Sequence, residues 1–243
     1  MSVNYFAILE GEYGSDIHDV EEVTTTQSVT STSSSSKKIK NRKNKASKAS
    51  SSGDAQQARS RLKAPLVWVD LEMTGLDLEK DVILEIAVII TDGSLHNIFE
   101  GPELTIHHSD MVLDNMNEWC VEQHGKSGLT EKVRQSRLSM QDAEAQVLAF
   151  IKAQGIQPKE ALIAGNSVHV DFNFLKKDMK QLAEYFHYRI VDVSSVKELC
   201  KRWYPAEAKS APMKSMAHTA MSDIRESIEE LKYLRGAIFK PTC

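Results

Sequence analysis

The chain has 243 residues, of which 41% are hydrophobic and 26% are charged, and its formal net charge is −4 at pH 7. This composition is close to that of an average globular protein, and no apolar run approaches the roughly 18 residues that a membrane span requires, so we expect no membrane association. The small negative net charge argues against a protein that binds long nucleic acids through global electrostatics, so any RNA contact must come from local arrangement. Cys120, Cys200 and Cys243 show no CxxC spacing, which argues against a disulfide framework and a zinc site.

The amino-terminal quarter is polar and of low complexity. Residues 23–60 hold a run of serines and then seven Lys or Arg residues between Lys37 and Lys48. Such a segment cannot bury enough apolar surface to offset its conformational entropy. We therefore predict a disordered Ser/Lys-rich extension over residues 1–62 and one folded domain over residues 63–240. The basic run fits a solvated linker, a nuclear-import signal or a non-specific RNA arm, and these interpretations stay open.

The first 22 residues carry six acids and no Lys or Arg, unlike an Arg-rich, acid-poor transit peptide. Together with the cysteine pattern, this favours an intracellular protein that is cytoplasmic, nuclear or both. A mitochondrial location stays open, without support from the amino terminus.

The first elements of the folded domain read as strands. Residues 66–69 and 82–91 are apolar and rich in β-branched residues, which predicts two buried strands with Gly75 in the turn between them. Two further strands are expected near residues 97–99 and 104–107, on either side of Gly101 and Pro102. These strands would form an antiparallel meander.

Helical spacing dominates from Ser139 onward. Ser139 and Asp142 form a capping pair, apolar residues recur at helical spacing, and Gly155 follows the predicted end of the helix. The remaining predicted elements are a strand at 161–164, a helix over 172–185, a strand at 189–191, a helix over 196–203 and a last helix over about 219–234. Strands followed by alternating helices and strands predict an α/β fold with a mixed sheet, antiparallel and then parallel, and helices on both faces.

Asp70 and Glu72 directly follow the first predicted strand. The strand period of two places both side chains on one face, where the two carboxylates would repel each other unless a cation neutralises them. An ordinary polar strand end is the alternative interpretation.

Asp171 lies where a short strand passes into a helix, at the carboxyl edge of the sheet that ligand sites of α/β proteins favour. Capping of that helix is the alternative role for this aspartate.

His218 and Asp223 are five residues apart near the start of the last helix. Five residues correspond to about 140° around a helix, so His218 must lie in the loop or first turn if both act at one site. An imidazole suits proton abstraction because its ordinary pKa is about 6.5, although any single histidine can equally be a capping or surface residue.

Together, DLE at a strand end, GNSxxxD and HxxxxD supply four acids and one histidine. This set suits two-metal phosphodiester cleavage, in which hard carboxylate oxygens bind two divalent cations. The expected cation is Mg²⁺, and Mn²⁺ can substitute for it.

Residues 66–240 resemble the oligoribonuclease family of DEDDh 3′–5′ exonucleases, which have a ribonuclease-H-like fold. The resemblance rests on five segments: LVWVDLEMTGLD, ILEIAVIITDG, GNSVHVDFNFL, HYRIVDVSSVKELCKRWYP and HTAMSDIRESIEELKY. It implies that Asp70, Glu72, Asp171 and Asp223 are metal ligands and that His218 is the general base. The segment departs from the family's pattern at Phe172 and Asn173, where many relatives carry basic residues, and at Ser222, where an acid is usual.

The resemblance also implies a substrate site. The equivalents of Leu76, Trp119 and His124 would cradle the two bases, and a second group would cap the 5′-phosphate, with the tyrosine and arginine reaching over from a partner subunit: Ser167, Tyr188, Arg189, Ser194 and Ser195. Aromatic and leucine side chains stack on any base, and a closed phosphate cap measures length. A core role for Trp119, and a plain polar strand start for Tyr188 and Arg189, remain alternatives.

The resulting hypothesis is a homodimeric 3′–5′ exoribonuclease that degrades short single-stranded RNA, especially dinucleotides, to mononucleotides. Two alternatives stay open: a related exonuclease acting on single-stranded DNA, which the cap residues disfavour, and a non-catalytic RNA-binding module on the same fold.

Overall fold

The computed structural model describes residues 62–212 and 219–241. The predicted extension over residues 1–62 therefore lies outside the described residues, apart from its last position, and its disorder stays a prediction. Within the described ranges, no helix combines the length and the apolar character needed to cross a bilayer.

The centre of the folded part is one mixed sheet of five strands in the order β3-β2-β1-β4-β5. The strands are β1 Leu66–Met73, β2 Ile83–Thr91, β3 Ile98–Thr105, β4 Leu162–Gly165 and β5 Ile190–Asp192. β1, β2 and β3 pair antiparallel, whereas β4 pairs parallel with β1 and with β5. The predicted α/β class, with an antiparallel meander joined to parallel strands, is confirmed.

The prediction of two strands around Gly101 and Pro102 is wrong, because β3 is one continuous strand through both residues. Pro102 is tolerated because β3 is an edge strand, where a missing N–H costs no ladder bond on the solvent side. A Cβ at Gly101 would collide with the ring of Phe150. This glycine therefore allows a close approach to the neighbouring helix and makes no turn.

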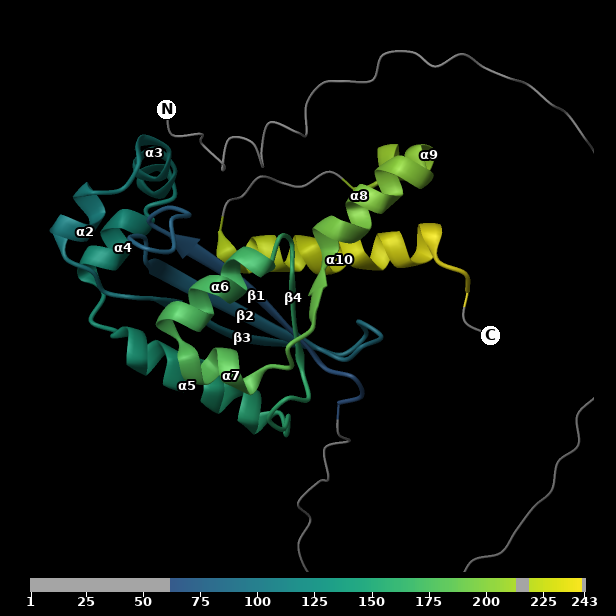
Figure 1. Cartoon of the computed structure of the whole chain (residues 1–243), viewed down its shortest axis with the longest axis horizontal. Helices are drawn as coiled ribbons and strands as arrows, with labels where there is room; N and C mark the ends of the chain where they lie inside the picture. The colour runs from purple at the N-terminus through teal and green to yellow at the C-terminus, as the bar shows by residue number, and fades with distance from the viewer. Residues whose placement is uncertain (1–61, 213–218, 242–243) are drawn as a thin grey trace, which may run out of the picture. The chain divides into compact units, whose positions relative to one another are not determined.

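Helices cover both faces of the sheet (Figure 1). They are α2 Asp110–Asp114, α3 Glu118–Lys126, α4 Leu129–Gln135, α5 Met140–Ala153, α6 His169–Asp178, α7 Lys180–Tyr185, α8 Val193–Trp203, α9 Pro205–Lys209 and α10 Ala220–Ile238. The helices α5, α6 and α7 pack against one apolar cluster of the sheet, while α8 and α10 pack against the other.

The side chains of β1 alternate between these two clusters. Val67, Val69 and Leu71 face the α5, α6 and α7 side, and Leu66 and Trp68 face the α8 and α10 side. The next two positions in the second series are the acids of the DxE motif. The alternation therefore places both acids beneath α10.

The predicted single helix over 172–185 is wrong: α6 begins earlier, and a break at Met179 separates it from α7. Met179 has φ −129° and ψ 64°, and its side chain is fully buried. The buried carboxylate of Glu144 in α5 accepts the N–H of Leu182 at 2.9 Å. A contact from a distant helix thus satisfies a backbone donor at the start of α7, which local sequence does not reveal.

The other predicted helices are present. Ser139 caps α5 by accepting the N–H of Asp142, and Thr219 caps α10 through Ser222. The four helices α2, α3, α4 and α9 were not predicted. A capping asparagine, Asn117, whose side chain accepts the N–H of Cys120, was the available signal for α3.

Candidate active site

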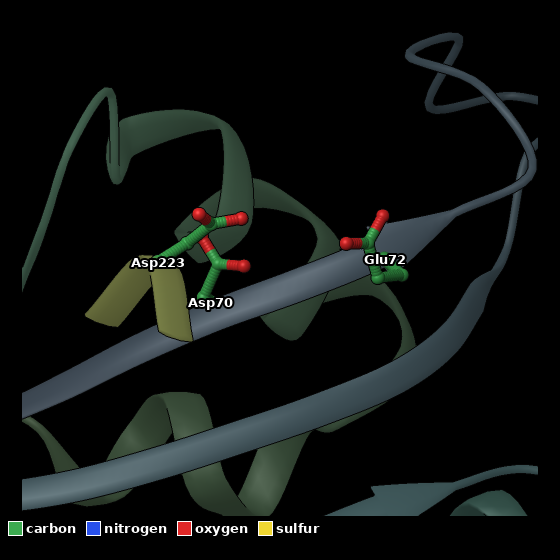
Figure 2. A group of neighbouring side chains, drawn as sticks. All are labelled: Asp70, Glu72 and Asp223. Carbon is green, nitrogen blue, oxygen red and sulfur yellow. The ribbon is translucent and has the colours of Figure 1, made fainter. Parts of the chain in front are cut away.

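Three carboxylates from two elements meet at the α10 face of the sheet. Asp70 and Glu72 stand two residues apart in β1, and Asp223 lies in the first turn of α10. Each offers an oxygen atom, and these oxygens all lie within 4.8 Å of one another (Figure 2). The shared strand face predicted for the DxE pair is therefore present, and the last helix adds the third acid.

The acid cluster is electrostatically unfavourable without a cation. Glu72 keeps 23% of its side chain exposed, yet its pKa rises to about 8, first because of burial and then because of Asp223, Glu85 and Asp171. Glu85 stands directly opposite Glu72 on β2, and its carboxylate accepts the Thr105 hydroxyl at 2.6 Å. Negative charge thus converges on Glu72 from several elements.

Asp171 comes to the same place from α6. It is buried, and its Oδ1 accepts the backbone N–H of Leu71 at 3.0 Å. Leu71 stands between Asp70 and Glu72 in β1. Burial raises the pKa of Asp171 to about 7, while the backbone N–H groups that it accepts lower it. The alternative role as a helix cap does not hold, because Val168 occupies the cap position of α6 and Asp171 lies inside the helix.

His218, the predicted general base, lies outside the described residues. Its neighbour Thr219 is described and caps α10, which begins at Ala220. Its role stays a prediction.

His124, one of the predicted base-cradle residues, is buried next to the acid cluster. Its Nε2 donates to the carbonyl of Met73 at 2.9 Å, and its Nδ1 lies 3.9 Å from Glu72 Oε2. Burial lowers the pKa of His124, so the ring is neutral at physiological pH with the proton on Nε2. The hydrogen bond docks α3 against the end of β1.

The other two cradle residues flank this contact. Trp119 lies on α3 as well and is half-buried, so it is no core residue, and Leu76 is half-buried in the loop after β1. The predicted cradle therefore comprises α3 and the loop after β1. His124 of α3 contacts both Met73 and Glu72 at the end of β1.

The predicted phosphate-cap serines also come together. Ser167 Oγ and Ser194 Oγ are 3.2 Å apart, and Ser195 follows as an exposed residue in the first turn of α8. Ser167 has a φ of 50°, a left-handed conformation that costs a non-glycine residue about 1 kcal/mol. Its N–H donates to Asp192 Oδ1 and to Ser194 Oγ, both at 3.0 Å, which stabilises this conformation.

Tyr188 and Arg189 precede β5 and are both exposed, Tyr188 by 73%. The Arg189 guanidinium lies 5.0 Å from the centre of the Tyr188 ring, and this ring stacks on His187. Their predicted contact with the substrate of a partner subunit stays a prediction.

The donor set fits divalent cations. Carboxylate oxygens are the hard ligands that Mg²⁺ and Mn²⁺ prefer, and their mutual repulsion and raised pKa values are what a bound cation would relieve. Among the residues that the structure describes, no cysteine sulfur belongs to this cluster.

Sequence reasoning assigned no role to Asn166 or Asp192, which connect the cap serines to the rest of the fold. Asp192 caps α8 through Ser194 N, and Asn166 bonds to both α8 and α10. The available sequence signals were that Asn166 precedes Ser167 and that Asp192 directly follows a predicted strand, shortly before Ser194.

A family model described as "Exonuclease" matches residues 67–231. The chain is 52% identical over 188 residues to the human "Oligoribonuclease, mitochondrial", covering 77% of this chain and 79% of that protein. It is 56% identical over 178 residues to the "Probable oligoribonuclease" of Dictyostelium discoideum, covering 72% and 90%. It is 52% identical over 174 residues to the "Oligoribonuclease" of Acinetobacter baylyi, covering 72% and 94%.

Solved structures of exonuclease I share the fold. One has a TM-score of 0.54 at 18% identity, covering 72% of this chain and 42% of that chain. A second, Escherichia coli exonuclease I in complex with an oligonucleotide, has a TM-score of 0.55 at 16% identity. The present chain thus spans about two-fifths of the exonuclease I chains that it matches.

Proposed function

The chain belongs to the oligoribonuclease family of exonucleases, and from this premise we propose that it removes mononucleotides from the 3′ end of short oligoribonucleotides, dinucleotides above all. The observation that carries the proposal is the convergence of Asp70, Glu72 and Asp223, with Asp171 bonded to the same strand. The substrate class comes from the family alone, whereas the acid cluster indicates where in the structure the reaction would occur.

The four acids would hold two divalent cations, Mg²⁺ with Mn²⁺ able to substitute, which when bound supply an activated water and neutralise the leaving 3′-oxygen. The chain's own contribution is to fix the carboxylates. Asp70 and Glu72 are fixed by the ladder of β1, Asp223 by the first turn of α10, and Asp171 by its bond to Leu71. His218 would take the proton of the attacking water, as its ordinary pKa near 6.5 suits.

The base cradle explains why the base sequence of the RNA substrate would have little effect on binding. Leu76 and Trp119 offer apolar and aromatic surface, which stacks on any base without hydrogen-bond readout. Neutral His124 is buried and tied to Met73, so it would support the wall of the cradle next to Glu72. Two nucleotides would fill this cradle between the acids and the cap serines.

The cap would measure substrate length. Ser194 and Ser195 lie in the first turn of α8, next to Ser167, and this group would contact a terminal phosphate through side-chain hydroxyls, because the Asp192 carboxylate already accepts the Ser194 N–H. A guanidinium and hydroxyls closing around that phosphate would leave no path for a longer strand. This supports preference for 5′-phosphorylated dinucleotides.

We also propose that the enzyme is a homodimer. Leu199, Trp203 and Tyr204 are exposed by 41%, 66% and 40%, and they lie together at the end of α8. Exposed large apolar side chains of this kind mark interaction surfaces. A partner covering them would bury an apolar patch and could bring Tyr188 and Arg189 to a second active site.

The decisive measurement is the cleavage rate on RNA from two to seven nucleotides long, with and without a 5′-phosphate, in Mg²⁺ and in chelator. We expect fastest turnover of the 5′-phosphorylated dinucleotide and none in chelator. Asp223→Ala should lose about 100-fold or more in rate, because a metal ligand is missing. Equal rates on long single-stranded DNA would favour the DNA exonuclease, and binding without turnover would favour the non-catalytic module.

The cellular location, cytoplasmic, nuclear or both, stays a prediction. Imaging of a carboxyl-terminal fluorescent fusion, with and without residues 37–48, would test whether the basic run directs nuclear import.

A further inference from the structure

Asn166 stands at the junction of three elements behind the proposed phosphate cap. It follows β4 directly, and its Oδ1 accepts the hydroxyl proton of Ser194 in α8 at 3.1 Å. Its Nδ2 donates to Ser227 Oγ at 2.7 Å and to Glu230 Oε2 at 3.2 Å, both in α10. One amide therefore joins the cap to the helix that carries Asp223.

The orientation of this amide is fixed by its α10 partners. Glu230 is buried, and its other carboxylate oxygen pairs with the buried Lys197 at 2.9 Å. An ionised carboxylate accepts hydrogen bonds only, so the amide nitrogen must face Glu230 and the amide oxygen must face Ser194. A flipped amide would place two oxygens in contact.

The fixed amide in turn sets the direction of the cap hydroxyls. Ser194 has one hydroxyl proton, which it gives to Asn166, so its oxygen serves as an acceptor toward Ser167. The N–H of Ser167 donates to that oxygen at 3.0 Å, and the Ser167 hydroxyl, 3.2 Å away, must be the donor of the second contact. When a phosphate oxygen arrives, the Ser167 hydroxyl can turn to it while Ser194 keeps its bond to Asn166.

The network also reaches the acid cluster. Ser227 Oγ donates to the backbone carbonyl of Asp223 at 2.8 Å. The same amide that orients Ser194 thus contacts the residue one turn after Asp223 in α10.

We propose that Asn166 is the positioning residue for 5′-phosphate recognition: by holding Ser194 as an acceptor, it leaves the Ser167 hydroxyl as the donor offered to the phosphate. This inference rests on the proposed function, since it needs the cap to bind the substrate's 5′-phosphate. Asn166 itself contacts the phosphate only through the serines.

The test compares kcat/KM for a 5′-phosphorylated and a 5′-hydroxyl RNA dinucleotide at saturating Mg²⁺. In Asn166→Ala, we expect the preference for the phosphorylated substrate to fall about 10-fold or more, because a hydrogen bond to a charged group is lost or misdirected. Turnover of the 5′-hydroxyl dinucleotide should change much less. A purely structural role would lower both rates together and leave the preference intact.

A double-mutant cycle tests the route of the effect. If Asn166 acts through Ser194, the two losses of preference should not multiply. The double variant, Asn166→Ala with Ser194→Ala, should then prefer the phosphorylated substrate as much as the single variant with the lower preference does. Losses that multiply would overturn the inference. Asn166→Ser is the second variant if Asn166→Ala does not fold: its shorter side chain lacks the amide that spans Ser194 and the α10 partners, so the same loss of preference is expected.

Asn115→Ala is the matched control, because Asn115 is exposed and its amide donates only locally to the Met111 carbonyl. It should keep the wild-type preference. Folded Asn166 variants that also keep the preference would refute this inference alone. A wild-type protein that cleaves both dinucleotides equally would instead refute the phosphate cap, and this inference with it.

Discussion

The Asp171 carboxylate accepts the backbone N–H of Leu71 at 3.0 Å, across 100 residues of sequence. Because Leu71 stands between Asp70 and Glu72, this one bond sets the start of α6 against the strand that carries the DxE pair. The bond also favours the ionised form of this carboxyl and so opposes burial, which raises the pKa of Asp171 to about 7. Asp171 therefore has two roles: it bonds α6 to β1, and it is a proposed metal ligand.

Two substitutions separate these roles. Asp171→Asn keeps an oxygen that accepts the Leu71 N–H but loses the charge, so we expect activity to fall about 100-fold or more with unfolding free energy nearly unchanged. Asp171→Ala should lose activity equally and also about 1–3 kcal/mol of stability, because a buried N–H loses its acceptor. Urea unfolding and dinucleotide turnover measure the two effects, and equal stability of both variants would contradict the structural role.

The stability of the metal-free protein should fall as pH rises. The carboxyls of Glu72 and Asp171 have pKa values raised from 4.5 to about 8 and from 3.8 to about 7. The folded chain thus holds these protons more tightly than the unfolded chain does. Their contribution to the unfolding free energy is complete below the ordinary pKa values and is lost as pH rises through 7 and 8.

Thermal unfolding in chelator from about pH 5 to about pH 9 tests this linkage. Added Mg²⁺ should raise Tm more at the alkaline end, because the ligands are then deprotonated without cost. Glu72→Gln should flatten the pH dependence in chelator. A Tm rise on Mg²⁺ addition that is equal at both ends would contradict the assignment of these acids as ligands.

Gly75 should be intolerant of a side chain. A Cβ at this position would collide with the Asp81 carboxylate, which accepts the Thr74 hydroxyl at 3.0 Å and the Asp77 N–H at 2.8 Å. Gly75→Ala should cost about 1–3 kcal/mol and raise KM, because the displaced loop carries Leu76. Gly125→Ala is the control: with open space around it in α3, it should leave stability unchanged or raise it by up to about 1 kcal/mol.

Removal of His218 should separate catalysis from metal binding. His218→Ala should lower kcat about 100-fold or more and abolish the rise of rate through pH 6.5, because the general base is lost. Its Mg²⁺ titration by Tm should match the wild type. His96→Ala, at an exposed turn, is the control and should keep full activity. A wild-type pH profile in His218→Ala would exclude His218 as the base.

Trp203 should hold the dimer together. Trp203→Ala should shift the protein toward monomer in light scattering and slow turnover of the 5′-phosphorylated dinucleotide, because Tyr188 and Arg189 would no longer reach a second site. Phe239→Ala, at a side chain exposed by 54% at the end of α10, should remain dimeric. A fully active Trp203→Ala monomer would remove the need for a shared cap.

Several elements followed from local sequence because their causes are local. Ser139 caps α5 through Asp142, three residues away, and the apolar alternation of β1 puts Asp70 and Glu72 on one face. The single helix over 172–185 and the two strands around Gly101 and Pro102 were predicted wrongly, and at both places the structure shows contacts from α5: Glu144 accepts the Leu182 N–H, and Phe150 lies close to Gly101. The local pattern of apolar and polar residues does not reveal contacts with residues that are distant in the sequence.

The sequence by itself determined the α/β class and singled out the candidate side chains for the chemistry, because strand period, helix spacing and motif order are properties of the chain. Only the tertiary structure decided that Asp223 lies within 4.8 Å of the DxE pair, that Asp171 bonds to Leu71, and that Asn166 joins α8 to α10. Hydrogen bonds and electrostatic repulsion act over a few ångströms, so residues far apart in sequence acquire them only when the sheet brings their elements together.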